Sequence, residues 1–214
     1  MPNWCDNQVT ITGPESVIDK IEKIVKEEKE ANGLLQFMFP MPKALEGTEA
    51  GPKAKNKKEQ LKRDQLRVDY GHENWYDWRC ENWGTKWEVN EFYGVDRIGK
   101  TLITFAFSSA WSPPVGAYQQ FLIDNIDCSL KAWYYEGGCD FMGVWEDGDD
   151  RCYECSTAGP KSDSPFYDHG DGKELDDYFG ITENLAEYEA EQEAEKEDVH
   201  EYVKGNKINI GEEV

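Results

Sequence analysis

The sequence predicts an α+β fold in which an antiparallel sheet carries two helices on one face. Residues 8–12 and 101–108 alternate polar and apolar side chains, which is the pattern of half-buried strands. Each of these strands precedes an amphipathic helix that begins at a proline, Pro14 or Pro113. A strand at residues 129–136 follows the second helix. This order is typical of the split βαβ, or ferredoxin-like, fold.

The first helix is predicted over residues 14–30, because apolar residues recur there at helical spacing: Val17, Ile18, Ile21, Ile24 and Val25. Asn32 and Gly33 supply a stop signal. Residues 34–39 are then predicted as the second strand, which Pro40 closes. The strands at 8–12 and 101–108 are expected to be the central ones.

Residues 43–100 interrupt this pattern and are predicted as a long insertion in a domain that covers residues 1–157. The insertion begins as a loop and continues as a basic helix over residues 53–67. Clustered cations of this kind are typical of phosphate contacts. The candidate nucleic-acid-binding residues are Lys57, Lys58, Lys62, Arg63 and Arg67.

Residues 74–87 (NWYDWRCENWGTKW) hold half of the eight tryptophans in the chain. Tryptophan is bulky, and its ring N–H requires a partner once it is buried. One interpretation is that Trp75, Trp78, Trp83 and Trp87 pack across the open face of the sheet. The other is that some rings stack on nucleic-acid bases or bind a partner. The small side chains expected on that face favour packing.

Gly137 and Gly138 indicate a hairpin that returns over residues 140–146 as an extra strand.

Residues 158–214 are predicted as an acidic linker and a helical tail. The composition then changes to Gly, Pro, Ser and Asp. A Glu- and Ala-rich helix follows at residues 183–203, with a narrow apolar stripe.

The chain is strongly acidic, with 44 Asp and Glu against 23 Lys and Arg and a net charge of −21. The excess lies mainly after residue 139, and such a field repels phosphates. The acidic tail has two interpretations: it increases solubility, or it binds a basic partner by imitating a phosphate backbone. The candidate partner-binding residues are Glu187, Glu189, Glu191, Glu193, Glu195, Glu197 and Asp198.

Cys152 and Cys155 form half of a zinc-binding pattern, which makes a structural zinc ion possible. The other cysteines and His72 do not form a second pair at standard spacing. Two reduced cysteines in a strand are the simpler interpretation, and no cofactor is otherwise expected. No phosphate-binding loop or catalytic constellation is visible, so we do not expect an enzyme.

No apolar stretch is long enough to span a membrane, and the N-terminus lacks the pattern of a signal peptide. We therefore expect a cytoplasmic protein with reduced cysteines and no membrane partner.

Five motifs in order resemble the YubB-like family of phage and plasmid proteins. They are MPNWCDN (1–7), VTITG (9–13), FPMP (39–42), the Trp-rich run (75–87) and AWSPP (110–114). The resemblance covers residues 1–146. It implies a ferredoxin-like fold and a mobile-element origin, and it supplies no catalytic residue.

The leading hypothesis is a non-enzymatic accessory protein of a phage or mobile element that acts inside the bacterial host cell. It would bind a host protein, such as a defence or nucleic-acid-handling factor, and inhibit it through nucleic-acid mimicry by the acidic surface. The alternative is a nucleic-acid or nucleotide binder that uses the basic helix and the Trp-rich insertion.

Overall fold

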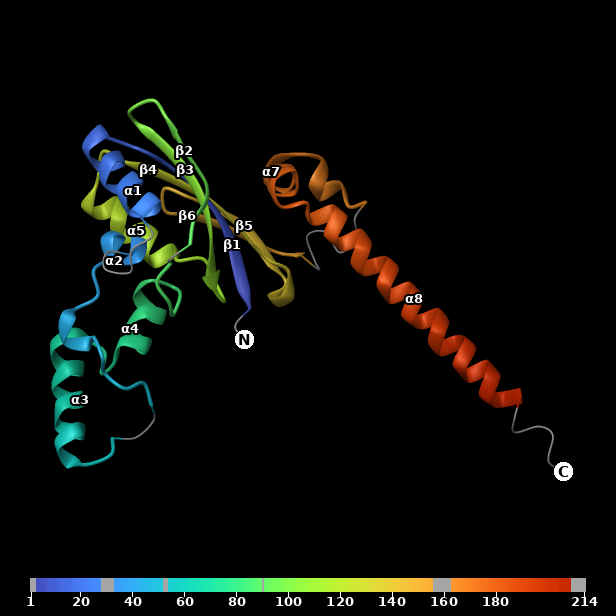
Figure 1. Cartoon of the computed structure of the whole chain (residues 1–214), viewed down its shortest axis with the longest axis horizontal. Helices are drawn as coiled ribbons and strands as arrows, with labels where there is room; N and C mark the ends of the chain where they lie inside the picture. The colour runs from blue at the N-terminus through green and yellow to red at the C-terminus, as the bar shows by residue number, and fades with distance from the viewer. Residues whose placement is uncertain (1–2, 28–32, 52–53, 90, 156–162, 209–214) are drawn as a thin grey trace. The chain divides into compact units, whose positions relative to one another are not determined.

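The computed structural model describes residues 3–27, 33–51, 54–89, 91–155 and 163–208 (Figure 1). The chain divides into two compact units, residues 1–152 and 153–214. The boundary that the composition predicts, between residues 157 and 158, lies outside the described residues.

A six-stranded sheet in the order β2-β3-β1-β4-β5-β6 forms the centre of the first unit. The strands are β1 (Trp4–Thr12), β2 (Tyr93–Ile98), β3 (Leu102–Ala110), β4 (Ser129–Glu136), β5 (Phe141–Glu146) and β6 (Asp149–Glu154). Strand β1 pairs antiparallel with both β3 and β4, so that Val9 lies opposite Phe105 and Ala132. The α+β class and the central position of β1 and β3 are confirmed. The ferredoxin-like topology stays a prediction.

The prediction of a strand at residues 34–39 is wrong, because a short helix, α2 (Leu34–Met38), lies there. The second strand of the sheet is β2, inside the segment predicted as an insertion. The Glu88 carboxylate accepts hydrogen bonds from the backbone N–H groups of Leu35 at 2.7 Å and Gln36 at 2.8 Å. These bonds satisfy the first turn of α2. A short, continuous apolar run does not distinguish a strand from a buried helix.

Two helices, α1 (Glu15–Glu27) and α5 (Val115–Asp124), cover one face of the sheet (Figure 1). The core lies between them and the alternate strand residues that point toward them. These buried strand residues include Val9, Ile11, Ile103, Phe105, Phe107 and Leu130. On the other face, Thr10 and Thr104 are only half-buried.

The tryptophan-rich segment does not cover the open face, so that prediction is wrong. Most of it is helix α4 (Trp75–Asn82), which packs against α5 on the helical side. Trp78 and Trp83 are buried there, and the Trp83 ring N–H donates to the Phe39 carbonyl oxygen at 2.7 Å. Only Trp87 lies beside an open-face residue, Trp4, with ring centroids 5.8 Å apart.

The predicted basic helix is present as α3 (Lys57–Tyr70). Its N-terminus is capped by Asn56, whose side chain accepts from the Glu59 N–H at 3.0 Å. It ends at Gly71 in the left-handed conformation, with φ of 78°. Only Arg63 and Leu66 of α3 are buried, so most of this helix faces solvent.

The second unit contains α7 (Gly170–Phe179) and the long helix α8 (Ile181–Ile208). Tyr167, Leu175 and Ile181 form its buried apolar contacts. The Asp176 carboxylate accepts from the Thr182 N–H at 2.7 Å and so fixes the start of α8. The acidic helix that the sequence predicts at residues 183–203 is therefore present.

Candidate functional site

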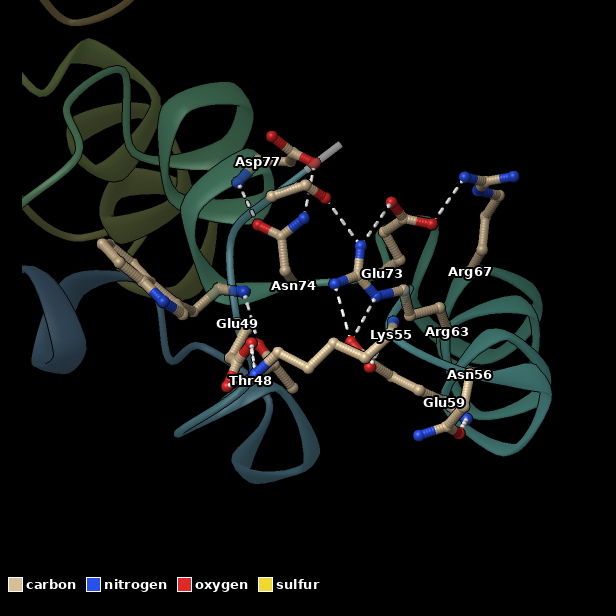
Figure 2. Close-up of polar contacts among 12 residues, drawn as sticks. Thr48, Glu49, Lys55, Asn56, Glu59, Arg63, Arg67, Glu73, Asn74 and Asp77 are labelled. Atoms are coloured by element: carbon tan, nitrogen blue, oxygen red, sulfur yellow. Dashed lines mark hydrogen bonds and ion pairs between the residues drawn. The ribbon is translucent and has the colours of Figure 1, made fainter. Parts of the chain in front are cut away.

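Arg63, one of the five candidate nucleic-acid-binding residues, is buried in a polar network (Figure 2). Its guanidinium donates to Glu59 Oε1 at 2.8 Å and to the Gly51 carbonyl oxygen at 2.7 Å. It also lies 3.8 Å from Glu73 Oε1. Figure 2 shows Arg63 between Glu59 and Glu73. Through Glu73 and the Gly51 carbonyl oxygen, Arg63 joins α3 to the loops that precede and follow it. Arg63 therefore stabilises the fold, and as a buried residue it is not exposed to contact a phosphate.

Arg67 belongs to the same network, because its Nη2 lies 2.7 Å from the other oxygen of Glu73. On the opposite side, the backbone N–H of Lys55 donates to Glu59 at 2.8 Å. That bond, with the bond from Arg63, holds the pKa of the Glu59 carboxyl below its usual value. Two of the five candidate cations are thus neutralised by carboxylates.

The other three candidate cations, Lys57, Lys58 and Lys62, are exposed on α3. They form no ion pair with any residue that the structure describes. The helix therefore keeps a smaller basic surface than the sequence predicts.

The acidic candidates lie along α8. Glu187, Glu191, Glu193, Glu195 and Glu197 are exposed, and Glu189 is half-buried. Asp198 lies in the same helix, but its side chain is outside the described ones. At 100° per residue the glutamates form two stripes on opposite sides of the helix. The carboxylates therefore surround α8 and do not form a single acidic face.

Cys152 is exposed and Cys155 is buried. Among the described residues, no group of three or more His, Cys, Asp or Glu side chains is placed to hold a metal ion. The carboxylates near His72 in the sequence are held in separate contacts. Glu73 pairs with Arg67, and Asp77 bonds to Asn74 at 2.6 Å.

The structure brings together a set of aromatic side chains that the sequence does not identify as a site. We call it the aromatic surface: Trp4, Trp87 and Trp111, with Lys86. The three tryptophans are 50%, 39% and 40% exposed. The Lys86 ammonium lies 4.0 Å from the ring centroid of Trp87 and 3.8 Å from that of Trp111. It therefore makes cation–π contacts with two rings.

Backbone contacts hold the aromatic surface in place. The Trp111 N–H donates to the Asn3 carbonyl oxygen at 3.0 Å, which fixes the residue before Trp4. The Thr85 hydroxyl donates to the Ala110 carbonyl oxygen at 2.8 Å, which connects the segment of Lys86 to the end of β3. Trp111 itself has φ of 74°, a conformation that a bulky residue rarely adopts. Such strain persists only where its surroundings enforce it.

Three of the five motifs contribute to the aromatic surface. Trp4 comes from MPNWCDN, Lys86 and Trp87 from the Trp-rich run, and Trp111 from AWSPP. Exposed tryptophan is unusual in a soluble domain, and it is enriched where proteins bind partners. The only sequence signal for this site was therefore a set of aromatic motifs far apart in the chain.

No model of a known protein family matches the sequence. The chain is similar to the uncharacterized protein YubB of Escherichia coli K12, with 30% identity over 71 residues. This match covers 33% of the chain and about half, 48%, of YubB.

Among solved structures, the chain is similar to the protein api92 from Yersinia pseudotuberculosis, of the family DUF1281. The TM-score is 0.41 and the identity 13%, over 72% of this chain and 98% of api92. Within the described residues, no helix is both long enough and apolar enough to cross a membrane.

Proposed function

We propose that this chain is a non-enzymatic accessory protein of a phage or related mobile element, which binds a basic host protein through α8. The observation that carries the proposal is the spacing of the exposed carboxylates on that helix. The resemblance of five motifs to YubB-like proteins supports the mobile-element origin. The site of action would be the bacterial cytoplasm.

The carboxylates of α8 repel one another in the unbound protein. Glu187, Glu191 and Glu195 follow each other at four-residue intervals, as do Glu189, Glu193 and Glu197. Like charges at this spacing destabilise a helix by about 0.2–0.5 kcal/mol per pair. The four pairs together cost on the order of 1–2 kcal/mol. A cationic partner would relieve this repulsion, so binding is favoured beyond the direct attraction.

The spacing also supports nucleic-acid mimicry. A carboxylate at every second residue places one negative charge per about 3 Å along the helix axis. One strand of DNA carries one phosphate per about 3.4 Å of its axis. The linear charge density of α8 is thus close to that of a single strand. Because the two stripes lie on opposite sides of α8, a partner surface would contact one carboxylate per about 6 Å, roughly half the phosphate density of a strand, and the second stripe would add to the field at longer range.

The test begins with capture of host proteins from a bacterial lysate on the full-length chain, followed by calorimetry with each purified partner. In the test variant, three glutamates become glutamine: Glu187, Glu191 and Glu195. An exposed ion pair contributes about 0.2–1 kcal/mol, so the loss of three pairs should weaken the affinity roughly 3- to 160-fold. The affinity of the unmodified chain should fall as salt rises.

The control variant removes the same charge from the first unit. It carries amides in place of three exposed carboxylates: Glu46, Asp96 and Asp127. Its affinity should stay close to that of the unmodified chain. Equal losses of affinity in both variants would mean that net charge alone explains the effect, and this result would overturn the role of α8. Capture of no basic protein would also overturn the proposal.

The alternative, nucleic-acid binding by the first unit, is supported by the exposed ammonium groups of Lys57, Lys58 and Lys62 on α3. Because Arg63 is buried and Arg67 is paired with Glu73, α3 offers fewer basic groups for contact with phosphate than the sequence predicts. A gel shift at low salt decides it, because phosphate contacts weaken as salt rises.

A further inference from the structure

A hollow of about 560 Å³ lies beside the aromatic surface, in the first unit. Seven of the residues that the structure describes line it: Trp4, Trp87, Glu88, Val89, Glu91, Tyr93 and Ser108. Three of the seven are large aromatic residues, and each is between 39% and 53% exposed. The rings of Trp4 and Trp87 are tilted at 45° to each other. Part of their surface is therefore open to a ligand.

The charged side chains that line the hollow are carboxylates, and the Lys86 ammonium lies on the ring of the neighbouring Trp87. Among the described lining residues, two are glutamates and none is a lysine or arginine. The Glu88 carboxylate already accepts from the N–H groups that begin α2, so Glu91 is the lining carboxylate open to a ligand. A third carboxylate, Asp6, accepts from the hydroxyl of the lining residue Ser108 at 2.8 Å. The Tyr93 hydroxyl donates to Glu91 at 3.2 Å, and the nearby carboxylates raise the pKa of Tyr93. The hollow thus combines ring faces with negative charge.

This combination selects a cation. Aromatic faces attract guanidinium and ammonium groups, and carboxylates strengthen that attraction. A stacked nucleic-acid base would use the same rings, but its phosphate would meet Asp6 and Glu91. Lys86 already places an ammonium group on the rings of Trp87 and Trp111. These rings therefore attract a cation in the folded protein, and because Lys86 would repel a second cation beside it, the ligand would lie toward Trp4, Tyr93 and Glu91.

Guanidinium fits better than ammonium for a ligand from outside. It is planar, stacks on aromatic rings, and is more weakly hydrated, so less free energy is needed to desolvate it. Its several donors also match more than one carboxylate. Because the backbone contacts of Asn3, Ala110 and Trp111 already hold the rings, binding would require little reordering.

We propose that this hollow binds the guanidinium group of an arginine side chain on a partner polypeptide. The inference does not depend on α8, since every residue of the hollow belongs to the first unit. Binding by α8 could fail while the hollow binds arginine, and the reverse also holds.

The test uses the full-length chain labelled with ¹⁵N and the tripeptide acetyl-Gly-Arg-Gly-amide. The matched probe carries citrulline, which keeps the shape of arginine and removes its charge. We expect the indole N–H signals of Trp4 and Trp87 to shift with the arginine peptide and to remain still with the citrulline peptide. Equal shifts with both peptides, or none with either, would overturn the proposal.

Two variants locate the binding. Glu91→Gln removes one carboxylate with little change of shape, and Trp4→Ala removes one ring. Each should weaken binding of the arginine peptide, and for Trp4→Ala the loss should be at least about twofold, the lower end for an exposed cation–π contact. The matched controls, Glu46→Gln and Ile126→Ala, change an exposed carboxylate and an exposed apolar residue elsewhere. Unchanged affinity in Glu91→Gln and in a folded Trp4→Ala would refute the site.

Discussion

Replacing Trp78 by alanine tests whether the tryptophan-rich segment belongs to the core of the first unit. The ring is 4% exposed. It packs against Phe39 and Trp83, with ring centroids 5.1 Å and 5.9 Å away. Truncation of a buried tryptophan costs about 3–5 kcal/mol. Because two edge-to-face contacts are lost with it, we expect the upper half of this range.

Urea unfolding followed by tryptophan fluorescence measures this cost. All eight tryptophans lie in the first unit, so the signal reports that unit and not the acidic helix. Domains are stable by only about 5–15 kcal/mol, so Trp78→Ala should lower the midpoint strongly. The matched variant Trp4→Ala removes a ring that is 50% exposed and should cost about 1 kcal/mol.

The comparison of the two variants decides between the two interpretations of the segment. Equal costs for Trp78→Ala and Trp4→Ala would refute the burial argument. A soluble and fully stable Trp78→Ala protein would do so directly, and it would indicate that Trp78 acts as a binding residue.

Three further predictions follow from the first unit. Gly33→Ala should cost about 1–3 kcal/mol in urea unfolding, because an added Cβ would lie 2.0 Å from the Glu88 carboxyl carbon and would displace this carboxylate from the backbone N–H groups of α2. Folding lowers the pKa of the Glu59 carboxyl group. Its ionised form therefore stabilises the folded protein fully at a pH above the usual carboxyl pKa, and this stabilisation is lost as the pH falls through the lowered pKa. Glu59→Gln should therefore flatten that part of the pH profile of unfolding. In gel shifts at low salt we expect no complex with single- or double-stranded DNA; a complex lost on changing Lys57, Lys58 and Lys62 to Gln would favour the alternative function.

Local patterns predicted the strands and helices whose burial alternates along the chain. Strand β3 has buried Ile103, Phe105 and Phe107 on one side, and that periodicity is visible in the sequence. Helix α2 could not be predicted in this way, since its five residues are apolar except for Gln36 and are too few to show a helical period. The group that caps it is Glu88, more than fifty positions later. A local pattern contains no information about such a partner.

The same limit applies to the candidate sites. Arg63 is one of several cations in the sequence, and only the fold shows that Glu59 and Glu73 enclose it. Trp4 and Trp87 are brought together by the loop that follows α4 and by the pairing of β1 with β3. Helical spacing predicts the Glu59–Arg63 pair, which is four residues apart, but neither the Glu73 contact nor the contact between Trp4 and Trp87. In contrast, the acidic stripes of α8 are predictable, because they depend only on helical periodicity.

The two proposed sites both select a cationic partner, but they do so by different physics. Exposed carboxylates on α8 act over a distance that salt shortens to about 8 Å at physiological ionic strength. A guanidinium group seated among Trp4, Trp87 and Tyr93 is partly withdrawn from solvent, so salt screens it less. Binding through α8 should therefore weaken steeply as salt rises, and binding through the hollow should change little. If the affinity for a partner falls with salt and then stays constant at high salt, the partner uses both sites. Glu91→Gln should then lower only the affinity that remains at high salt.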